Sequence, residues 1–126
     1  MMFARPRDVS IFRPYPEEMT NDRLECVLAA SDLDLVRVAK WEGEIAARYQ
    51  LKQMTKTEFV LESIRVEMAY RSRGLGSWML GHSIGLAEAR GGRSIGVAFD
   101  RRHRFFERRG FGRTKNGVLR LEVQPE

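Results

Sequence analysis

The sequence predicts a mixed α/β fold with a mostly antiparallel sheet, on three observations. Residues 33–66 contain three runs in which apolar and polar side chains alternate, separated by short turns, as in strands joined by hairpins. Residues 75–90 carry apolar side chains at helical spacing. The apolar run at 93–99 follows that helix, so we expect it to join the sheet parallel to the preceding strand.

Length and composition predict one globular domain without a membrane partner. The chain has 126 residues, of which 43% are hydrophobic and 31% charged, which is typical of soluble domains. No apolar run approaches the roughly 20 residues of a membrane span, and the basic start lacks a signal-peptide core. We therefore expect a cytoplasmic protein. The formal charge of +5 suits an anionic cofactor and would also suit nucleic acid.

The first third of the chain is the least regular. Residues 8–13 alternate as a first strand, which Pro14 ends. Residues 16–30 begin like a helix, although the run at 24–30 could equally be a strand, so residues 14–34 stay open. Cys26 is the only cysteine, which excludes an internal disulfide and a cysteine-rich metal site, and we interpret it as a buried hydrophobe rather than a catalytic thiol.

The central strands are predicted at 33–40, 45–54 and 58–66, with hairpin turns at 42–44 and 55–57. Together they would form an antiparallel meander.

The following helix, residues 75–90, should end at the glycine pair 91–92. Its sheet-facing side chains would be Leu75, Met79, Ile84 and Ala87. A second helix at 101–109 stops at Gly110. The last strands are expected at Phe111 and at 118–123, around an Asn116-Gly117 turn.

A glycine- and arginine-containing turn, residues 71–76 (Arg-Ser-Arg-Gly-Leu-Gly), joins the third central strand to the long helix. Backbone N–H groups at the start of a helix have no partner in the helix, and with the helix dipole they attract phosphate. We expect Gly74 and Gly76 to take left-handed dihedrals and to let an anion approach. The turn is neither a dinucleotide fingerprint, which needs glycine at Met79, nor a P-loop, because Ser77 follows directly.

The spacing of Val66, Arg71, Gly74 and Gly76 resembles the acetyl-CoA loop of the GCN5-related N-acetyltransferases, the GNAT superfamily. That loop reads Arg/Gln-x-x-Gly-x-Gly/Ala after a strand ending in valine. A second block at 105–111, Phe-Phe-Glu-Arg-Arg-Gly-Phe, is similar to the family's Phe-Tyr-Glu-x-x-Gly-Phe. The resemblance implies one GNAT-like acyl-CoA-binding domain over residues 1–126, with a central splayed cleft flanked by helices.

The resemblance also implies a cofactor site for acetyl-CoA. The pyrophosphate would be bound by Arg71, Ser72, Arg73, Gly74, Leu75, Gly76 and Ser77. The pantetheine arm would lie along Ile64, Arg65 and Val66, and Phe105 and Phe106 would also belong to the site.

Glu62 is the predicted general base. It lies four residues before Val66 and matches the acid of the family's Glu-x-Leu/Ile-x-Val strand. A carboxylate half-buried in a cleft would have a raised pKa. The alternative is a solvent-facing residue paired with Arg37 or Arg65. Glu58 lies on the same face and is the reserve candidate.

Two family residues for the leaving thiolate are replaced. Phe106 stands where the family often has tyrosine, and Phe99 where it has asparagine. Tyr70 and His103 are the candidate substitutes, the alternative being that Tyr70 is a packing residue and His103 a solvated one. Solvent or backbone N–H groups would also suffice. The replacements also favour a rival interpretation, a non-catalytic acyl-CoA-binding or regulatory module.

Two further patterns suggest other functions. The arginines form a dense cluster at positions 101, 102, 104, 108 and 109, which we interpret as a solvated face from which one or two could reach the 3′-phosphate of coenzyme A. No aromatic platform accompanies them, which argues against nucleic acid. Residues 81–85 (Gly-His-Ser-Ile-Gly) match the elbow of serine hydrolases, but Ser83 would lie mid-helix. We expect these glycines to let helix and sheet approach closely.

The function implied is transfer of an acetyl group from acetyl-CoA to a primary amine of a small molecule or peptide, without a metal ion. The acceptor itself is not identified. Because the N-terminal part is short for this family, we also expect a homodimer in which a partner completes the site.

Overall fold

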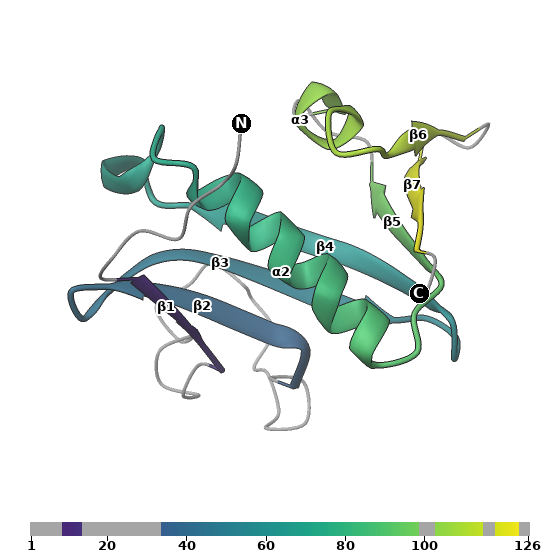
Figure 1. Cartoon of the computed structure of the whole chain (residues 1–126), viewed down its shortest axis with the longest axis horizontal. Helices are drawn as coiled ribbons and strands as arrows, with labels where there is room; N and C mark the ends of the chain where they lie inside the picture. Colours follow the sequence, from purple (N-terminus) through teal and green to yellow (C-terminus); the bar gives the residue numbers. More distant parts are fainter. Residues whose placement is uncertain (1–8, 14–33, 99–102, 115–117, 124–126) are drawn as a thin grey trace. The chain divides into compact units, whose positions relative to one another are not determined.

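The computed structural model describes residues 9–13, 34–98, 103–114 and 118–123. Within these residues, seven strands follow one another across the sheet in the order β1-β2-β3-β4-β5-β7-β6 (Figure 1). The chain divides into two compact units, one made of Met1–Gln50 and Ser63–Leu80, the other of Leu51–Glu62 and Gly81–Glu126. The mixed α/β fold and the mostly antiparallel sheet are confirmed.

The first unit contains the N-terminal strands. β1 (Val9–Phe12) pairs antiparallel with β2 (Val36–Trp41), and β2 pairs antiparallel with β3 (Glu44–Gln53). The strands predicted at 8–13, 33–40 and 45–54 are therefore present.

The hairpin between β2 and β3 turns through two residues with positive φ, Glu42 at 51° and Gly43 at 84°. Left-handed dihedrals at both positions are typical of the tight turn whose twist matches that of the strands. The turn confirms the hairpin predicted at 42–44, and it places Trp41 opposite Glu44 in the ladder.

Tyr49 is a fully buried residue of β3 that the sequence did not single out. Burial raises the pKa of its phenol well above the ordinary value, because the charged form would lose its hydration, while the nearby Arg37 guanidinium acts in the opposite direction. Arg37 lies directly across the ladder from Tyr49.

β4 (Glu58–Val66) begins after the second predicted turn, at 55–57. The Thr55 hydroxyl accepts hydrogen bonds from the backbone N–H groups of Thr57 (3.3 Å) and Glu58 (3.0 Å), which closes this turn locally.

The burial pattern along β4 changes phase near its middle. Phe59 and Leu61 are buried with the two-residue period of a strand, whereas the next buried residue, Ile64, lies three positions on. The parallel ladder with β5 (Ser94–Ala98) runs from Glu58 to Leu61. The alternation of buried residues and the ladder with β5 therefore both end at Leu61, directly before Glu62.

The long helix α2 (Leu75–Ala89) buries a stripe at helical spacing. Its buried side chains are Leu75, Met79, Leu80, Ser83 and Ala87. The predicted stripe was partly wrong, because Ile84 is only half-buried while Leu80 and Ser83 are fully buried. Ser83 does lie mid-helix, as expected, so the hydrolase elbow is excluded.

The helix ends at a glycine pair, as predicted. Gly91 has a φ of 88°, and the N–H groups of Gly91 and Gly92 donate to the carbonyls of Glu88 (3.0 Å) and Ala87 (2.8 Å). A Cβ at Gly92 would lie 2.7 Å from the Ala87 oxygen, so no larger residue fits without movement.

Gly81 and Gly85, in the interior of α2, do not serve close packing, so that prediction was wrong. A Cβ at Gly81 or Gly85 would meet nothing within 4 Å, and both residues are exposed.

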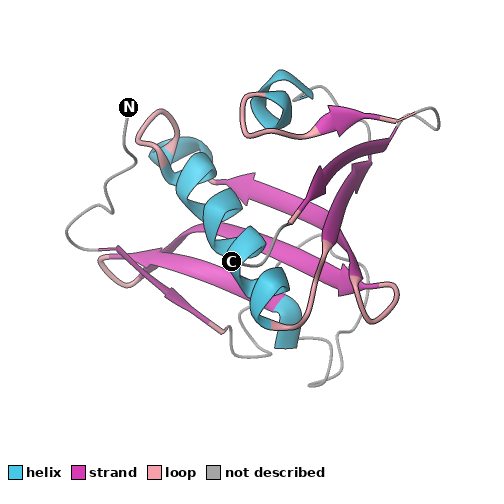
Figure 2. Ribbon diagram, turned by 45° about the vertical axis from the view of Figure 1, so that its right-hand side comes forward, coloured by secondary structure: helices cyan, strands magenta, loops and turns pink. Residues whose placement is uncertain are grey.

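The second unit is completed by the C-terminal elements (Figure 2). β5 is parallel to β4, as predicted, and β7 (Val118–Glu122) runs antiparallel to β5 and pairs with the short β6 (Gly112–Arg113). Phe111, expected in a strand, instead precedes β6 and is buried. The described helix α3 (His103–Glu107) ends before the predicted Arg109, because the chain turns over 108–110 with Gly110 at a φ of 96°.

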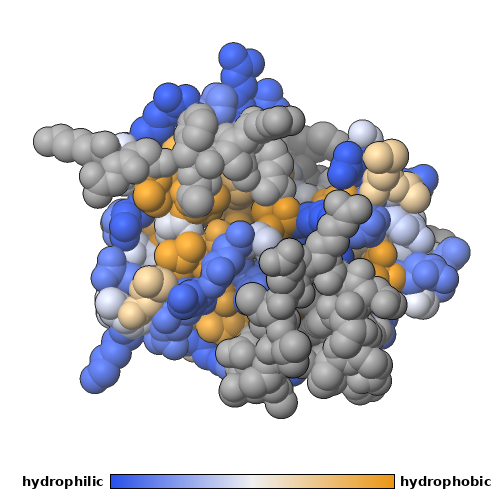
Figure 3. Space-filling view, turned by 180° about the vertical axis from the view of Figure 1, so that it is seen from behind, coloured by the Kyte–Doolittle hydropathy of each residue, from blue (hydrophilic) through white to orange (hydrophobic). Residues whose placement is uncertain are grey.

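Several predictions lie outside the described residues. They concern the segment 14–33 with Cys26, the arginines at 101 and 102, Phe99, and the turn at 116–117. None of the described helices is long and apolar enough to cross a membrane. On the face shown in Figure 3, hydrophobic and hydrophilic residues both reach the surface.

Candidate functional site

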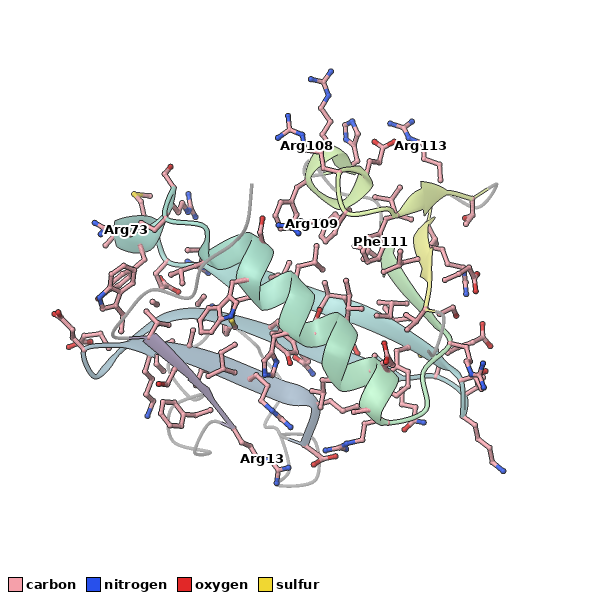
Figure 4. All side chains as sticks on the ribbon, viewed as in Figure 1. Arg13, Arg73, Arg108, Arg109, Phe111 and Arg113 are labelled. Atoms are coloured by element: carbon pink, nitrogen blue, oxygen red, sulfur yellow. The ribbon has the colours of Figure 1, made fainter. Side chains whose placement is uncertain are left out.

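The connection from β4 to α2 contains the predicted anion loop and lies within the first unit. After Val66 the chain forms a short 3-10 helix, η2 (Met68–Tyr70), and turns through residues 71–74 before α2 begins at Leu75. Figure 4 shows Arg73 beside this connection.

The loop conformation depends on two left-handed residues. Gly74 has a φ of 82°, as predicted, and Ser72 has a φ of 65°. The prediction for Gly76 was wrong, since this residue lies in the first turn of α2 and has no positive φ. Serine rarely adopts this conformation, so the sequence carried no signal for Ser72.

The start of α2 presents backbone donors to the loop. The Trp78 N–H donates to the Gly74 carbonyl (3.1 Å), so Gly74 is the residue at which helical hydrogen bonding starts. The N–H groups of Leu75, Gly76 and Ser77 precede this bond and have no partner within the helix. No acidic side chain stands in the first turn to offset the positive end of the dipole. This end of α2 is therefore suited to an anion.

Arg71 ties the loop to the strand that precedes it. Its Nε donates to the Val66 carbonyl oxygen at 3.1 Å, although the side chain is exposed. The contact holds the two ends of the η2 segment together and keeps the Arg71 guanidinium next to the loop.

Trp41, which the sequence analysis did not single out, contacts η2 through Tyr70 and the loop through Arg73. Its ring centroid lies 5.6 Å from that of Tyr70 with an interplanar angle of 33°, and the Arg73 Cζ lies 5.1 Å from it. Tyr70, predicted as a substitute proton donor, is thus placed next to the loop with its ring packed on Trp41. Only the hairpin register brings Trp41 here, so no local pattern could have revealed it.

A second missed group is an ion-pair cluster at the end of β4. The Glu67 Oε1 lies 3.4 Å from the Arg48 Nη1 and 3.6 Å from the Arg65 Nε. The Glu67 N–H also donates to the Ala46 carbonyl at 2.8 Å, which fixes this residue against β3. Arg65, one of the predicted pantetheine residues, therefore directs its side chain to Glu67, while Ile64 is buried and Val66 half-buried.

The two candidate bases belong to the second unit and differ in environment. The Glu62 side chain is exposed, not half-buried as expected. Glu58 is engaged at the first residue of β4, where its Oε2 lies 3.4 Å from the Arg120 Nη1 and its Oε1 accepts from the Thr55 hydroxyl at 3.3 Å. Arg120 also donates to the hydroxyl of the buried Ser94 at 3.1 Å, which marks Glu58 as part of a structural polar cluster.

The aromatic residues of the second motif form a packed cluster in the second unit. Phe106 is fully buried, and its ring meets those of Phe105 and Phe111 edge to face at centroid distances of 5.2 and 5.6 Å. The position at which the family often has tyrosine is therefore a core position in this chain.

The predicted arginine cluster is exposed only in part, and its positions 101 and 102 lie outside the described residues. Arg104, Arg108 and Arg113 are exposed, and the Arg113 Nη2 lies 3.7 Å from the Glu107 carboxylate. His103 and Arg109 are half-buried.

The chain matches the family model described as the acetyltransferase (GNAT) family over residues 4–111. No curated protein sequence matches it. Its fold is similar to that of Ard1 from Thermoplasma volcanium, at 17% identity and a TM-score of 0.74 over 94% of this chain and 99% of that one.

Two other solved structures share the fold. One is a GNAT family acetyltransferase from Elizabethkingia anophelis with acetyl-CoA bound, at 17% identity and a TM-score of 0.73 over 94% of this chain and all (100%) of that one. The other is N-acetylglutamate synthase from Neisseria gonorrhoeae complexed with coenzyme A and N-acetyl-glutamate, at 14% identity and a TM-score of 0.76 over 97% of this chain and 37% of that one. With the family model matching most of the sequence and the fold in agreement, the chain belongs to the GNAT family of acetyltransferases.

Proposed function

We propose that this acetyltransferase uses acetyl-CoA as its donor and transfers the acetyl group to a primary amine. One observation carries the proposal: the loop between η2 and α2, in which the left-handed Ser72 and Gly74 precede three N–H groups at a helix start without an acidic neighbour. Such a site fits the pyrophosphate of coenzyme A. The coenzymes bound by two structural neighbours support the same assignment.

The residues present fit the donor. The N–H groups of Leu75, Gly76 and Ser77 would bind pyrophosphate oxygens, and the absence of a Cβ at Gly76 lets an oxygen approach the backbone. Arg71 and Arg73 supply positive charge on both sides of Ser72. The backbone of Ile64, Arg65 and Val66 would align the pantetheine arm as an added strand does. Phe105 and Phe106 are proposed as further donor-site residues because of the family motif alone.

When bound, acetyl-CoA supplies an activated acetyl group as a thioester. The chain's own task is to take a proton from the amine as its nitrogen bonds to the acetyl carbon and the carbon–sulfur bond breaks. Glu62, at the point where β4 changes phase, is the proposed base, directly or through a water molecule.

The leaving sulfur must gain a proton, and Phe106 has none to give. Tyr70 carries a hydroxyl and directly precedes the loop, and we propose that it or solvent protonates the sulfur. The ion pair of Glu58 with Arg120 argues against Glu58 as the reserve base.

The acceptor is proposed to be a small-molecule or peptide amine in the cytoplasm, with a homodimer completing the acceptor side. The basic charge of +5 favours acceptors that carry acidic groups near the amine.

The direct test measures binding and turnover separately. Calorimetric titration should show saturable micromolar binding of acetyl-CoA, roughly −8 kcal/mol, and Gly74→Trp should abolish it by filling the loop. Release of the coenzyme thiol would then be followed over a panel of primary amines. Absence of donor binding by the wild type would refute the proposal.

A second candidate function, a non-catalytic acyl-CoA-binding module, is favoured by the complete burial of Phe106. Phe106→Tyr separates the two functions. A large gain in turnover indicates a site built for transfer. Tight donor binding without turnover in either protein favours the binding module.

A further inference from the structure

Trp41 lies outside the loop and contacts both η2 and the loop itself. Its indole packs against the ring of Tyr70, the last residue of η2, and the Arg73 guanidinium of the loop lies over the indole, with its Cζ 5.1 Å from the ring centroid. A guanidinium stacked on an aromatic face is attracted by the ring and still presents N–H donors at its edge.

The hairpin holds Trp41 in place independently of the loop. Trp41 is paired in the sheet on both sides, with Val9 of β1 and Glu44 of β3, and the turn that follows has two left-handed residues, Glu42 and Gly43. The main chain of Trp41 is therefore held by the sheet, independently of the loop that its indole contacts.

Arg73 is the more exposed member of the pair. It is exposed and stands between Ser72 and Gly74, the two residues that define the loop conformation. A long exposed arginine loses rotamer freedom when it binds an anion, and a side chain already restricted by stacking loses less. Restriction of Arg73 before the donor arrives would thus strengthen donor binding.

We propose that Trp41 is a positioning residue for the acyl donor and acts through Arg73, whose guanidinium it holds at the anion loop. This inference rests on the proposed function, because it assumes that the loop binds the coenzyme pyrophosphate. It assigns Trp41 to donor affinity and not to the chemical step.

A double-mutant cycle on acetyl-CoA affinity tests the proposal, using wild type, Trp41→Leu, Arg73→Met and the double variant. Loss of the indole should weaken binding by roughly two- to fivefold, the range expected of an exposed cation–π pair. The same change in the Arg73→Met background should have no further effect, because the group on which Trp41 acts is gone. Trp41→Phe keeps an aromatic face and should retain most of the affinity.

Kinetics and fluorescence provide readouts that simple packing would not change. Trp41→Leu should raise the KM for acetyl-CoA and leave kcat unaltered. The chain has two tryptophans, so Trp78→Phe makes Trp41 the only indole emitter. Its emission should change on titration with acetyl-CoA, and Arg73→Met should reduce that change.

Two outcomes overturn the inference and differ from failure of the proposed function. Equal weakening by Trp41→Leu in both backgrounds would show that Trp41 acts by packing alone, and tighter binding would show that it withholds Arg73 from the donor. If the wild type itself fails to bind acetyl-CoA, the proposed function falls, and this inference with it.

Discussion

Replacing Gly74 with alanine should weaken donor binding far more than an equally strained replacement elsewhere. Gly74 has a φ of 82° in the anion loop, and Gly91 has a φ of 88° at the end of α2. The nearest atom to a Cβ at Gly91 is the Lys56 carbonyl oxygen at 3.6 Å, an ordinary contact. Gly91→Ala is therefore a matched control, with the same backbone penalty at a position outside the loop.

The backbone penalty follows from the dihedral angle. A residue with a Cβ pays about 1–2 kcal/mol to remain in the left-handed region, so both variants should lose about that much free energy of unfolding. For a chain of this size the loss corresponds to a fall in Tm of about 3–10 °C.

The effect on binding should separate the variants. Relief of the strain in Gly74→Ala requires a change of φ at residue 74, which reorients the peptide groups on its two sides relative to each other, including the one that carries the Leu75 N–H donor. We expect the affinity for acetyl-CoA to fall at least roughly tenfold, or about 1.4 kcal/mol, whereas Gly91→Ala should bind like the wild type.

Thermal unfolding and calorimetric titration of the two purified variants provide the assay. Wild-type affinity in Gly74→Ala, with the expected loss of Tm, would refute the argument that this loop conformation binds the donor. Equal loss of affinity in both variants would attribute the effect to general destabilisation.

Three further predictions concern other parts of the chain. Gly81→Ala should raise the free energy of unfolding by about 0.5–1 kcal/mol, because its Cβ meets nothing within 4 Å. Gly92→Ala should lower it, because its Cβ would lie 2.7 Å from a helix carbonyl oxygen. Urea titrations in which the two variants change the free energy of unfolding in the same direction would contradict this. Glu62→Gln should reduce turnover by about 10²-fold and leave the affinity for the donor unchanged. Glu58→Gln alters a structural ion pair and should not reduce turnover in this way. An equal loss of turnover in both variants would exclude Glu62 as the base. Burial raises the pKa of Tyr49 above its ordinary value near 10.0, so as the pH rises the phenol of the unfolded chain loses its proton first. The stabilisation that this group contributes is therefore full below about pH 10 and declines as the pH rises further. Tyr49→Phe should make the fall in the free energy of unfolding with alkaline pH less steep, and an unchanged dependence on pH would refute the role of Tyr49.

Much of the fold could be predicted because it is encoded locally. The alternation of 45–54 and 58–66, the glycine pair after α2 and the hairpin at 42–44 each reflect the conformational preference of a few neighbouring residues. The anion loop was found in the same way, because Gly74 lies between a strand pattern and a helix pattern.

The errors have physical causes that no local pattern contains. Ile84 and Leu80 are both apolar, and only the rotation of α2 about its axis decides which of them is buried. Gly81 and Gly85 read as close-packing glycines, yet both are exposed.

The sequence by itself determined the order of the elements, the family motif and the position of the anion loop, because backbone preferences and spacing act between near neighbours. The tertiary structure alone decided what surrounds that loop. Trp41 meets Arg73 through the register of a hairpin, and Arg48 meets Glu67 across strands. Such contacts arise from long-range pairing, whose partners are chosen by the packing of the whole sheet.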